Sequence, residues 1–263
     1  MTAILRRACL GAAGIAAAFG AAELATWLSG ADQATFPLPS TVLVQAADLV
    51  TNSAFTSAVG ATMAAWGEAM LITVAIAVPL GVLLGTLPGA ESAVRPVLEF
   101  LRPIPSVVLI PLVLLIVQDN QRTEITVIVF ASVWPVLINT VYGLREVDPA
   151  AKETLRSFGF GPLSVTGRVA LPSAAPFIAT GVRIAASLAF VVAIAAELVG
   201  TGMNGIGAFA GQAQSGADGV PVMIAAAAWS GLIGLVLNGL FLGVERRVFR
   251  WHFALSGLAG DLR

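Results

Sequence analysis

The stretch LREVDPAAKETLRSFGFGPLSVTGRVALPSAAP, residues 144–176, lies between two long apolar runs and differs from both in composition. Asp148 can accept a backbone N–H as a helix N-cap, and Pro149 suits the first helical position because its missing donor would be unpaired there. Gly159 and Gly161 are expected to end that helix, since glycine best tolerates the left-handed conformation past a helix end. The stretch therefore predicts a short helix followed by a tight turn.

A second short helix is predicted after the turn. Pro162 can occupy its first position, and Pro172 is expected to end it because proline lacks the N–H that a helix interior needs. The two helices would form a helix–turn–helix knuckle that is attached at both ends to apolar segments. Force applied to the knuckle would then reach those segments directly.

The first helix of the knuckle carries a small apolar face whose residues recur at three- and four-residue spacing. An amphipathic helix of this kind can lie in a groove of a partner protein or on a membrane surface, and the pattern alone leaves both open. The apolar face comprises Ala151, Thr154 or Leu155, and Phe158, and its polar rim comprises Lys152, Glu153 and Arg156.

Apolar runs of about the length of a bilayer crossing flank the knuckle on both sides. Apolar residues make up 57% of the 263-residue chain and charged residues 11%, and a soluble fold of this size could not bury so much apolar surface. We predict an all-α membrane protein with six transmembrane helices. The runs lie near residues 8–28, 68–88, 97–117, 123–143, 177–199 and 222–244.

The runs divide the chain into four parts. The first part resembles a signal peptide, because Arg6 and Arg7 precede an Ala-rich run. The run is long enough to cross a membrane, so we expect a first transmembrane helix that is not cleaved. The second part is Pro-rich near its start and is expected to form short interfacial helices outside the membrane. The parts are a first transmembrane helix at 1–28, an external segment at 29–67, a core at 68–245 that includes the loop 144–176, and a cytoplasmic tail at 246–263.

The positions of Lys and Arg predict the orientation, because cytoplasmic loops are enriched in both. With the N-terminus inside, thirteen of the fourteen fall on the cytoplasmic side, and only Arg122 falls outside. The segments 29–67 and 200–221 contain neither residue. Both termini and the knuckle are therefore predicted to be cytoplasmic.

Four residues are candidate pathway or gate positions. Pro103 and Pro105 interrupt the third run, and the carbonyls that they free are tolerated at membrane depth only against protein or a cavity. Arg102 follows Glu99 by three residues, so the two are placed to pair on one helical face. Glu197, near the outer end of the fifth run, either faces the bundle interior or reaches the lipid headgroups.

Small and aromatic residues in the runs have expected structural roles. Glycines within spans let helix backbones approach closely, and tryptophans suit span ends or pathway walls. The glycines are Gly81, Gly85, Gly181 and Gly231, and the tryptophans are Trp66, Trp134, Trp229 and Trp251.

The knuckle resembles a known signature. Glu153, Gly159, Val169, Leu171 and Pro172 follow the pattern E-A-A-x-x-x-G-x9-[I/V]-x-L-P of permeases in binding-protein-dependent ATP-binding cassette importers. Thr154 and Leu155 stand in place of the two alanines. The resemblance implies that the knuckle couples the chain to an ATPase. The residues implied in coupling are Ala151, Lys152, Glu153, Thr154, Leu155, Phe158, Gly159, Leu171 and Pro172.

The resemblance extends over about residues 36–245 and narrows to permeases of the nitrate, sulfonate, taurine and bicarbonate group. It implies a type I importer fold in a bacterial inner membrane, with an N-terminal helix and a five-helix core. It also implies a second permease copy or a paralogue, a dimer of cytoplasmic ATPases that bind ATP and magnesium, an external solute-binding protein and a small anionic solute. The similar segments are FPLPSTV from Phe36, PVLEFLRPIPSVVLIPLVLL from Pro96, NTVYGL from Asn139, LPSAAPFIATGVRIA from Leu171 and AELVGTGMNGIGAF from Ala196.

Two other classes of function are weighed against this interpretation. An ion-coupled secondary transporter would use internal repeats and carboxylates within its spans, and neither is prominent in the sequence. An intramembrane enzyme would need a set of catalytic residues, and this sequence offers none. Cys9 and His252 are its single cysteine and histidine, and no H-E-x-x-H occurs. No G-x-x-x-x-G-K-[ST] phosphate loop occurs, so no cofactor is expected in this chain. A nucleic-acid partner is not expected.

Overall fold

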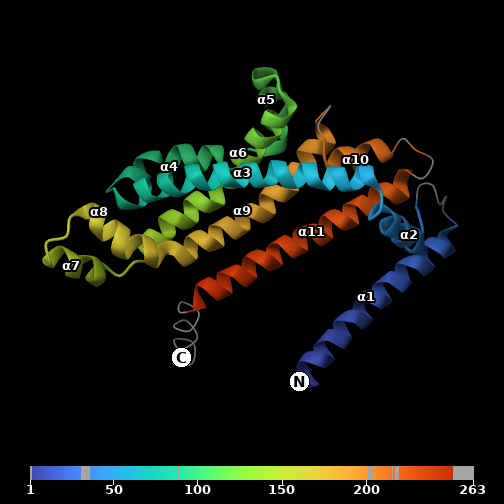
Figure 1. The fold of residues 1–263 in the computed structure, drawn as a ribbon, viewed down its shortest axis with the longest axis horizontal. Coiled ribbons are helices and arrows are strands. Elements are labelled where there is room, and N and C mark those ends of the chain that lie inside the picture. Colours follow the sequence, from blue (N-terminus) through green and yellow to red (C-terminus); the bar gives the residue numbers. More distant parts are fainter. Residues whose placement is uncertain are drawn as a thin grey trace.

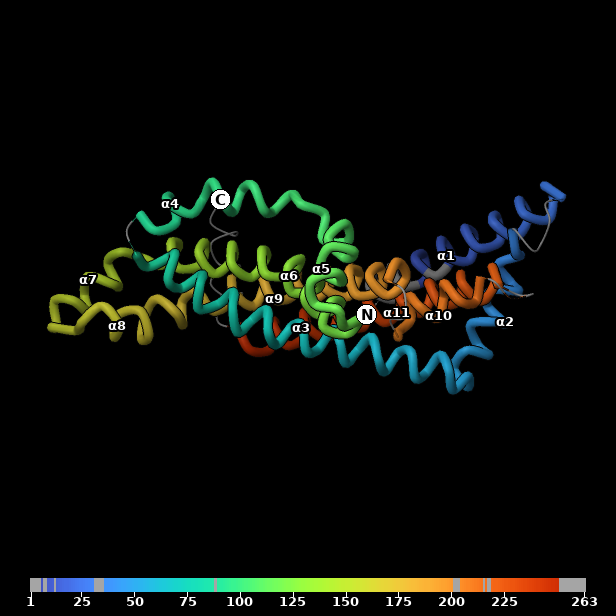
Figure 2. The backbone as a smooth tube through the Cα atoms, turned by 90° about the horizontal axis from the view of Figure 1, so that it is seen from above, coloured from blue at the N-terminus to red at the C-terminus, as the bar shows by residue number. Residues whose placement is uncertain are grey.

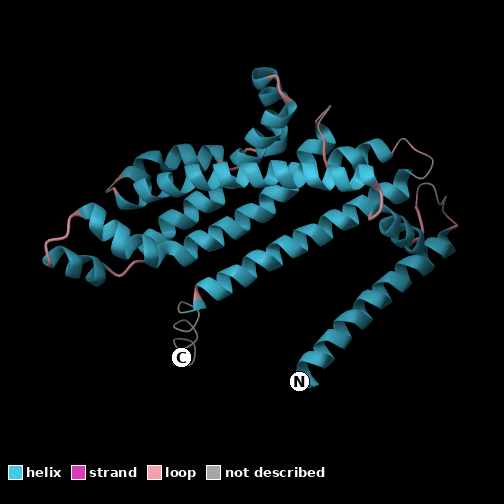
Figure 3. Cartoon of the chain, in the orientation of Figure 1, coloured by secondary structure: helices cyan, strands magenta, loops and turns pink. Residues whose placement is uncertain are grey.

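The structure is a computed structural model that describes residues 2–30, 36–87, 89–200, 204–214, 216 and 219–250. Every regular element in these residues is a helix, as Figure 3 shows. The elements in chain order are α1 (Thr2–Ser29), α2 (Pro39–Leu49), α3 (Ser53–Thr86), α4 (Ala90–Leu101), η1 (Ser106–Leu109), α5 (Ile110–Val117), α6 (Asn120–Arg145), α7 (Pro149–Ser157), α8 (Pro162–Val165), η2 (Thr166–Ala170), α9 (Leu171–Val199), α10 (Ile206–Ala213) and α11 (Gly219–Val248).

The predicted membrane spans are present in the described residues, with one difference. Helices α1, α3, α6, α9 and α11 contain segments long and apolar enough to cross a membrane. The third predicted run is instead a broken pair, α4 followed by η1 and α5, which bends by 79° between Leu101 and Ser106. The pair makes a sixth crossing only if it counts as one span. In Figure 1, α5 projects away from the other helices.

The bend lies at the helix break that the sequence predicts. Pro103 and Pro105 remove two backbone donors, so α4 cannot continue through them. The chain resumes as a turn of 3₁₀-helix at Ser106 and then as α5. A change of direction therefore follows from the two prolines, although an apolar run alone would suggest a straight span.

Helix α3 begins earlier than the apolar run near residues 68–88. The side chain of Asn52 caps it by accepting hydrogen bonds from the backbone nitrogens of Ala54 (2.9 Å) and Phe55 (3.1 Å). Among the described residues of the segment 29–67, α2 is the one separate short helix, and residues 53–67 belong to the long helix α3. Glu23 of α1 accepts hydrogen bonds from the backbone nitrogen and the hydroxyl of Ser40, which attaches α1 to the start of α2.

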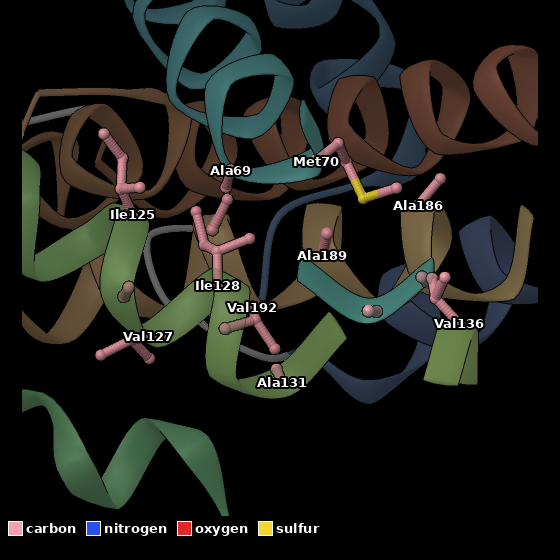
Figure 4. Close-up of a cluster of buried hydrophobic side chains, with 14 of the residues drawn as sticks. Ala69, Met70, Ile125, Val127, Ile128, Ala131, Val136, Ala186, Ala189 and Val192 are labelled. Atoms are coloured by element: carbon pink, nitrogen blue, oxygen red, sulfur yellow. The ribbon is translucent and has the colours of Figure 1, made fainter. Parts of the chain in front are cut away.

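The core lies where α6 packs between α3 and α9 (Figure 4). The approach is close because glycines replace larger side chains at the crossings. A Cβ atom at Gly81 would lie 2.6 Å from the Cβ of Thr140, and one at Gly181 would lie 2.7 Å from the Cβ of Asn139. Gly85 likewise faces Leu144. The predicted packing role of these three glycines is confirmed.

The prediction is wrong for Gly231, because an added Cβ there would meet nothing within 4 Å. Helix α11 packs on α9 one turn later, at Gly234, where an added Cβ would lie 3.5 Å from the ring of Phe190. An ion pair fastens the same two helices, since Arg183 Nε lies 2.9 Å from Glu245 Oε2. Thr180 also donates a hydrogen bond of 2.6 Å to Glu245.

Four of the short helices lie at the two ends of the bundle. Figures 1 and 2 show α7 and α8 at one end, and α2 and α10 at the opposite end. We call these the knuckle end and the α10 end. Which end faces the cytoplasm stays a prediction. Residues 251–263, the greater part of the predicted tail with Trp251 and His252, lie outside the described residues.

The glycine crossings lead to a stability prediction. Gly81→Ala should destabilise the protein by about 1–3 kcal/mol, because the new methyl group would overlap the fully buried Thr140. The matched control is Gly231→Ala, where space is open and alanine is the better helix former. The measurement is the apparent melting temperature of each purified variant in detergent. A Gly81→Ala variant as stable as the control would contradict the proposed packing role.

Candidate functional site

The first helix of the knuckle forms as predicted. Asp148 accepts a hydrogen bond of 2.8 Å from the backbone nitrogen of Ala150, and Pro149 is the first residue of α7. Gly159 follows the helix in the left-handed conformation, with φ of +84°. Gly161 differs from the prediction, because its backbone is extended with φ of −72° and it caps α8 instead. A single glycine therefore makes the turn.

The second helix of the knuckle is not ended by Pro172, contrary to the prediction. Helix α8 passes into the π-helical turn η2 and then directly into α9, whose first turn contains Pro172. Proline is tolerated at this position because a wider π-turn precedes it and the regular α-helix begins there. The knuckle is therefore continuous with α9, and a displacement of α8 acts along that helix.

The surface of the knuckle presents large apolar side chains. Phe158 is 78% exposed and Leu163 is 90% exposed, on either side of the turn. Ala151 and Leu155 are half-buried, so the predicted apolar face is divided between the interior and the surface. The other exposed coupling candidates are Glu153, Thr154, Gly159, Leu171 and Pro172. Two exposed apolar side chains beside charged ones are typical of a surface that binds another protein.

Polar contacts hold the knuckle to the bundle. Lys152 Nζ donates a hydrogen bond of 2.9 Å to the backbone oxygen of Leu144 in the last turn of α6. The guanidinium of Arg168 lies 4.9 Å from the centre of the Phe160 ring, which braces the turn. A cavity of about 640 Å³ remains between the knuckle and the end of α3. The knuckle is thus fastened to α6 and α9 but has room to move against α3.

The predicted helix break borders a second cavity, of about 430 Å³. Arg102, Pro103 and Pro105 line it from the break, and middle turns of α6 and α9 supply the opposite wall. The predicted pair of Glu99 with Arg102 is not among the ion pairs of the described residues. The structure therefore places three of the four candidate pathway residues in one cavity.

Glu197, the fourth candidate, faces the bundle interior and is 1% exposed. Its carboxylate accepts hydrogen bonds from the hydroxyl of Thr62 in α3 (2.6 Å) and the backbone nitrogen of Gly207 in α10 (2.8 Å). The backbone nitrogen of Ile206 donates to the same Thr62 hydroxyl at 2.9 Å. Glu197 therefore joins α3, α9 and α10, and the headgroup alternative is excluded.

A second buried carboxyl group was missed by the sequence reasoning. Glu124 in the first turns of α6 is 4% exposed and lies near enough to Glu197 for the two carboxyl groups to interact, and its Oε1 has no hydrogen-bond partner among the described residues. Glu124 also lines a cavity of about 530 Å³ at the α10 end. The available signal was an acidic residue at the start of an apolar run.

Trp66 and Trp229 are half-buried and form hydrogen bonds between helices, a role beyond the span ends and pathway walls that the sequence suggests. The indole nitrogen of Trp66 donates to the backbone oxygen of Ala186 at 2.9 Å, and that of Trp229 donates to Ala46 at 2.8 Å. Both bonds join different helices. Trp134 lines the cavity beside the helix break, as expected for a pathway wall.

Most of the chain matches a known protein family. Residues 77–250 match the family described as "Binding-protein-dependent transport system inner membrane component". The matched range includes the helix break, α6, the knuckle, α9 and α11. It covers more than half of the chain.

Several curated relatives are similar in sequence. The chain is 35% identical over 163 residues to a bicarbonate transport system permease protein of Synechocystis sp., covering 62% of this chain and 58% of the relative. It is 32% identical to a nitrate import permease protein of Leptolyngbya laminosa, covering 65% and 61%. A probable ABC transporter permease protein of Brucella abortus is 29% identical, covering 86% and 89%. The match thus spans less than two thirds of the length of the bicarbonate and nitrate relatives.

A solved structure shares the fold. The chain resembles a subunit of the MetNI methionine ABC transporter in an inward-facing conformation, with a TM-score of 0.66 and 19% identity. The likeness covers 74% of this chain and 96% of the other. At this identity the comparison establishes the fold alone.

The contacts of Glu197 lead to a prediction about the α10 end. Thr62→Val should loosen α10, because it leaves one carboxylate oxygen and the Ile206 backbone nitrogen without their partner, at about 1–3 kcal/mol for each buried group. Hydrogen exchange of peptides covering residues 204–214 should become faster. The matched control is Thr126→Val, since the Thr126 hydroxyl is exposed and bonds only within α6. Unchanged exchange in Thr62→Val would contradict this role.

Proposed function

Since the chain belongs to the family of binding-protein-dependent transport system inner membrane components, we propose that it is the transmembrane permease subunit of an ATP-binding cassette importer. The family consists of transport subunits rather than enzymes, and the chain is a multi-pass membrane protein. Its proposed role is to form, with a second permease, a pathway for a small solute. The alternative of an ion-coupled secondary transporter receives no support from the relatives.

One observation carries the proposal: the knuckle has apolar side chains on its surface and is also attached to the membrane-spanning helices. Phe158 and Leu163 offer apolar surface that a groove of an ATPase subunit can cover. Lys152 bonds to the end of α6, and α8 continues into α9. A push on the knuckle is therefore delivered to the two helices that form the centre of the core.

The proposed role as a permease subunit implies several partners. A dimer of cytoplasmic ATPases would bind ATP and magnesium and act on the knuckles of two permeases, which are two copies of this chain or one copy and a paralogue. An external solute-binding protein would deliver the solute at the α10 end. This arrangement places the knuckle end in the cytoplasm, in agreement with the orientation that the Lys and Arg residues predict.

The proposed solute is a small anion. Support comes from two relatives whose names specify bicarbonate and nitrate. The fold supports many solutes, so the solute must be tested directly.

Transport by the reconstituted complex is the direct test. Proteoliposomes that contain the permease with its ATPase, and a solute-loaded binding protein, should accumulate radiolabelled bicarbonate or nitrate only when ATP is supplied. Leaving out the ATPase should abolish uptake. Uptake driven by a proton or sodium gradient without ATP would overturn the proposal in favour of a secondary transporter.

The turn of the knuckle gives a test of coupling. Gly159→Val should abolish the stimulation of ATPase activity by the solute-loaded binding protein, because φ of +84° costs a non-glycine residue about 1–2 kcal/mol and valine more. The protein should still reach the membrane, since an added Cβ would meet nothing within 4 Å.

Gly161→Val is the matched control for this variant. It adds the same bulk two residues away, also in open space, at a backbone conformation that valine readily adopts. The ATPase rate of each variant is measured with and without the loaded binding protein. Normal stimulation in Gly159→Val, or equal loss in both variants, would contradict a role for the turn conformation.

A further inference from the structure

The cavity between the knuckle and α3 lies where membrane-spanning helices end. Its walls include the last turns of α3, residues 78–87, and the start of α9 at Leu171. Both helices contain segments long and apolar enough to cross a membrane, and α3 ends at Thr86. The cavity volume of about 640 Å³ falls within the range of about 300–1,000 Å³ that is typical of ligand sites. A ligand in it would lie at the depth of the lipid headgroups.

Two cationic side chains line this cavity, and no acidic side chain does. Lys152 and Arg156 lie four residues apart on α7, so they share one helical face. The cavity at the α10 end has the opposite character, because Asp119 and Glu124 line it and no lysine or arginine does. An anion is therefore favoured at the knuckle end of the bundle and disfavoured at the α10 end.

The two cations are not neutralised by a carboxylate. Neither belongs to the three ion pairs found among the described residues. Lys152 Nζ donates one hydrogen bond to the backbone oxygen of Leu144, which leaves two of its three N–H groups for an anion. Arg156 is exposed, and a guanidinium can hold two oxygens of a phosphate at once. Glu153, the acidic residue between them on α7, does not line the cavity.

The α3 side of the cavity is mainly apolar and open to the surroundings. It includes Val82, Leu83 and Leu87. Leu83 is 51% exposed and Leu87 is 50% exposed, so no described part of the chain covers them fully. Cationic and apolar surfaces that meet at the end of a span suit the two parts of a phospholipid, its charged headgroup and its acyl chains. A free phosphate ion would use only the cationic part.

We propose that this cavity binds one anionic phospholipid from the membrane leaflet at the knuckle end, with its phosphate at Lys152 and Arg156 and an acyl chain against α3. Basic pockets between membrane helices hold anionic headgroups in this way. The lipid would lie between the knuckle and α3, where the knuckle has room to move, and would limit that movement. Lipid binding is independent of the proposed function, whereas an effect on coupling to the ATPase rests on it.

Photolabelling of the full-length protein in lipid nanodiscs tests the site. The probe is phosphatidylglycerol with a photoreactive acyl chain, diluted into phosphatidylcholine, and the labelled peptides are identified by mass spectrometry. Labelling of peptides that cover residues 78–87 should saturate at a low fraction of the probe. Unlabelled phosphatidylglycerol should compete for this labelling, whereas unlabelled phosphatidylcholine and water-soluble glycerol phosphate should not. A phosphatidylcholine probe with the same acyl chain should label these peptides without saturation.

Variants test the role of charge. Arg156→Gln should raise the probe fraction for half-saturation about fivefold, the contribution of one basic residue near anionic headgroups. The matched control is Arg168→Gln, which removes the same charge from the same knuckle outside the cavity lining and should leave half-saturation unchanged. Thr86→Glu adds a carboxylate to the lining at an exposed position, and it should abolish the saturable labelling.

The outcomes separate this site from general lipid contact and from the proposed function. Equal shifts in Arg156→Gln and Arg168→Gln, or unsaturable labelling of α11 and residues 78–87 to the same extent, would overturn the site. Addition of the ATPase subunit should leave the labelling in place, and its loss would assign the cavity to that subunit and contradict the proposal. Saturable labelling in a reconstituted complex that shows no ATP-dependent uptake would count against the proposed function alone.

Discussion

The close crossing of α6 with α3 and α9 is the contact on which the rest of the structure depends. In a membrane no hydrophobic effect drives helices together, so stability comes from tight packing and from polar contacts between them. Gly81, Gly143 and Gly181 allow this packing, because each faces a side chain or backbone that a methyl group would overlap. The three helices therefore form one unit, and shorter elements at either end are positioned by it.

Buried polar groups add specific connections to this unit. Glu197 joins α3, α9 and α10 through Thr62 and Gly207, and Glu245 joins α11 to α9 through Arg183. Each carboxylate is satisfied by donors from another helix, which is how charged groups persist within apolar surroundings. These bonds fix which helices are neighbours, whereas the glycines fix how closely they approach.

The three functional regions differ in how they relate to the core. The knuckle extends beyond it and is continuous with α9, which suits it to receive force from a partner. The cavity beside the helix break lies between residues 102–106 and the middle turns of α6 and α9, and η1 and α5, which follow the two prolines, pack against α6. At the α10 end, Glu197 is buried and Glu124 borders a cavity. The knuckle, the cavity beside the helix break and the cavity at the α10 end therefore lie at three separate positions along the bundle.

The sequence by itself determined the helical class, most of the spans, the break at Pro103 and Pro105, and the turn at Gly159, because each depends on local composition or on the backbone of one residue. Tertiary structure alone decided that Pro172 continues into α9, that Glu99 and Arg102 do not pair, and that Glu124 meets Glu197. Glu124 and Glu197 lie far apart in the sequence, so no local pattern predicts that they interact. Side-chain partners across helices depend on how the helices pack, and that packing is a property of the whole bundle.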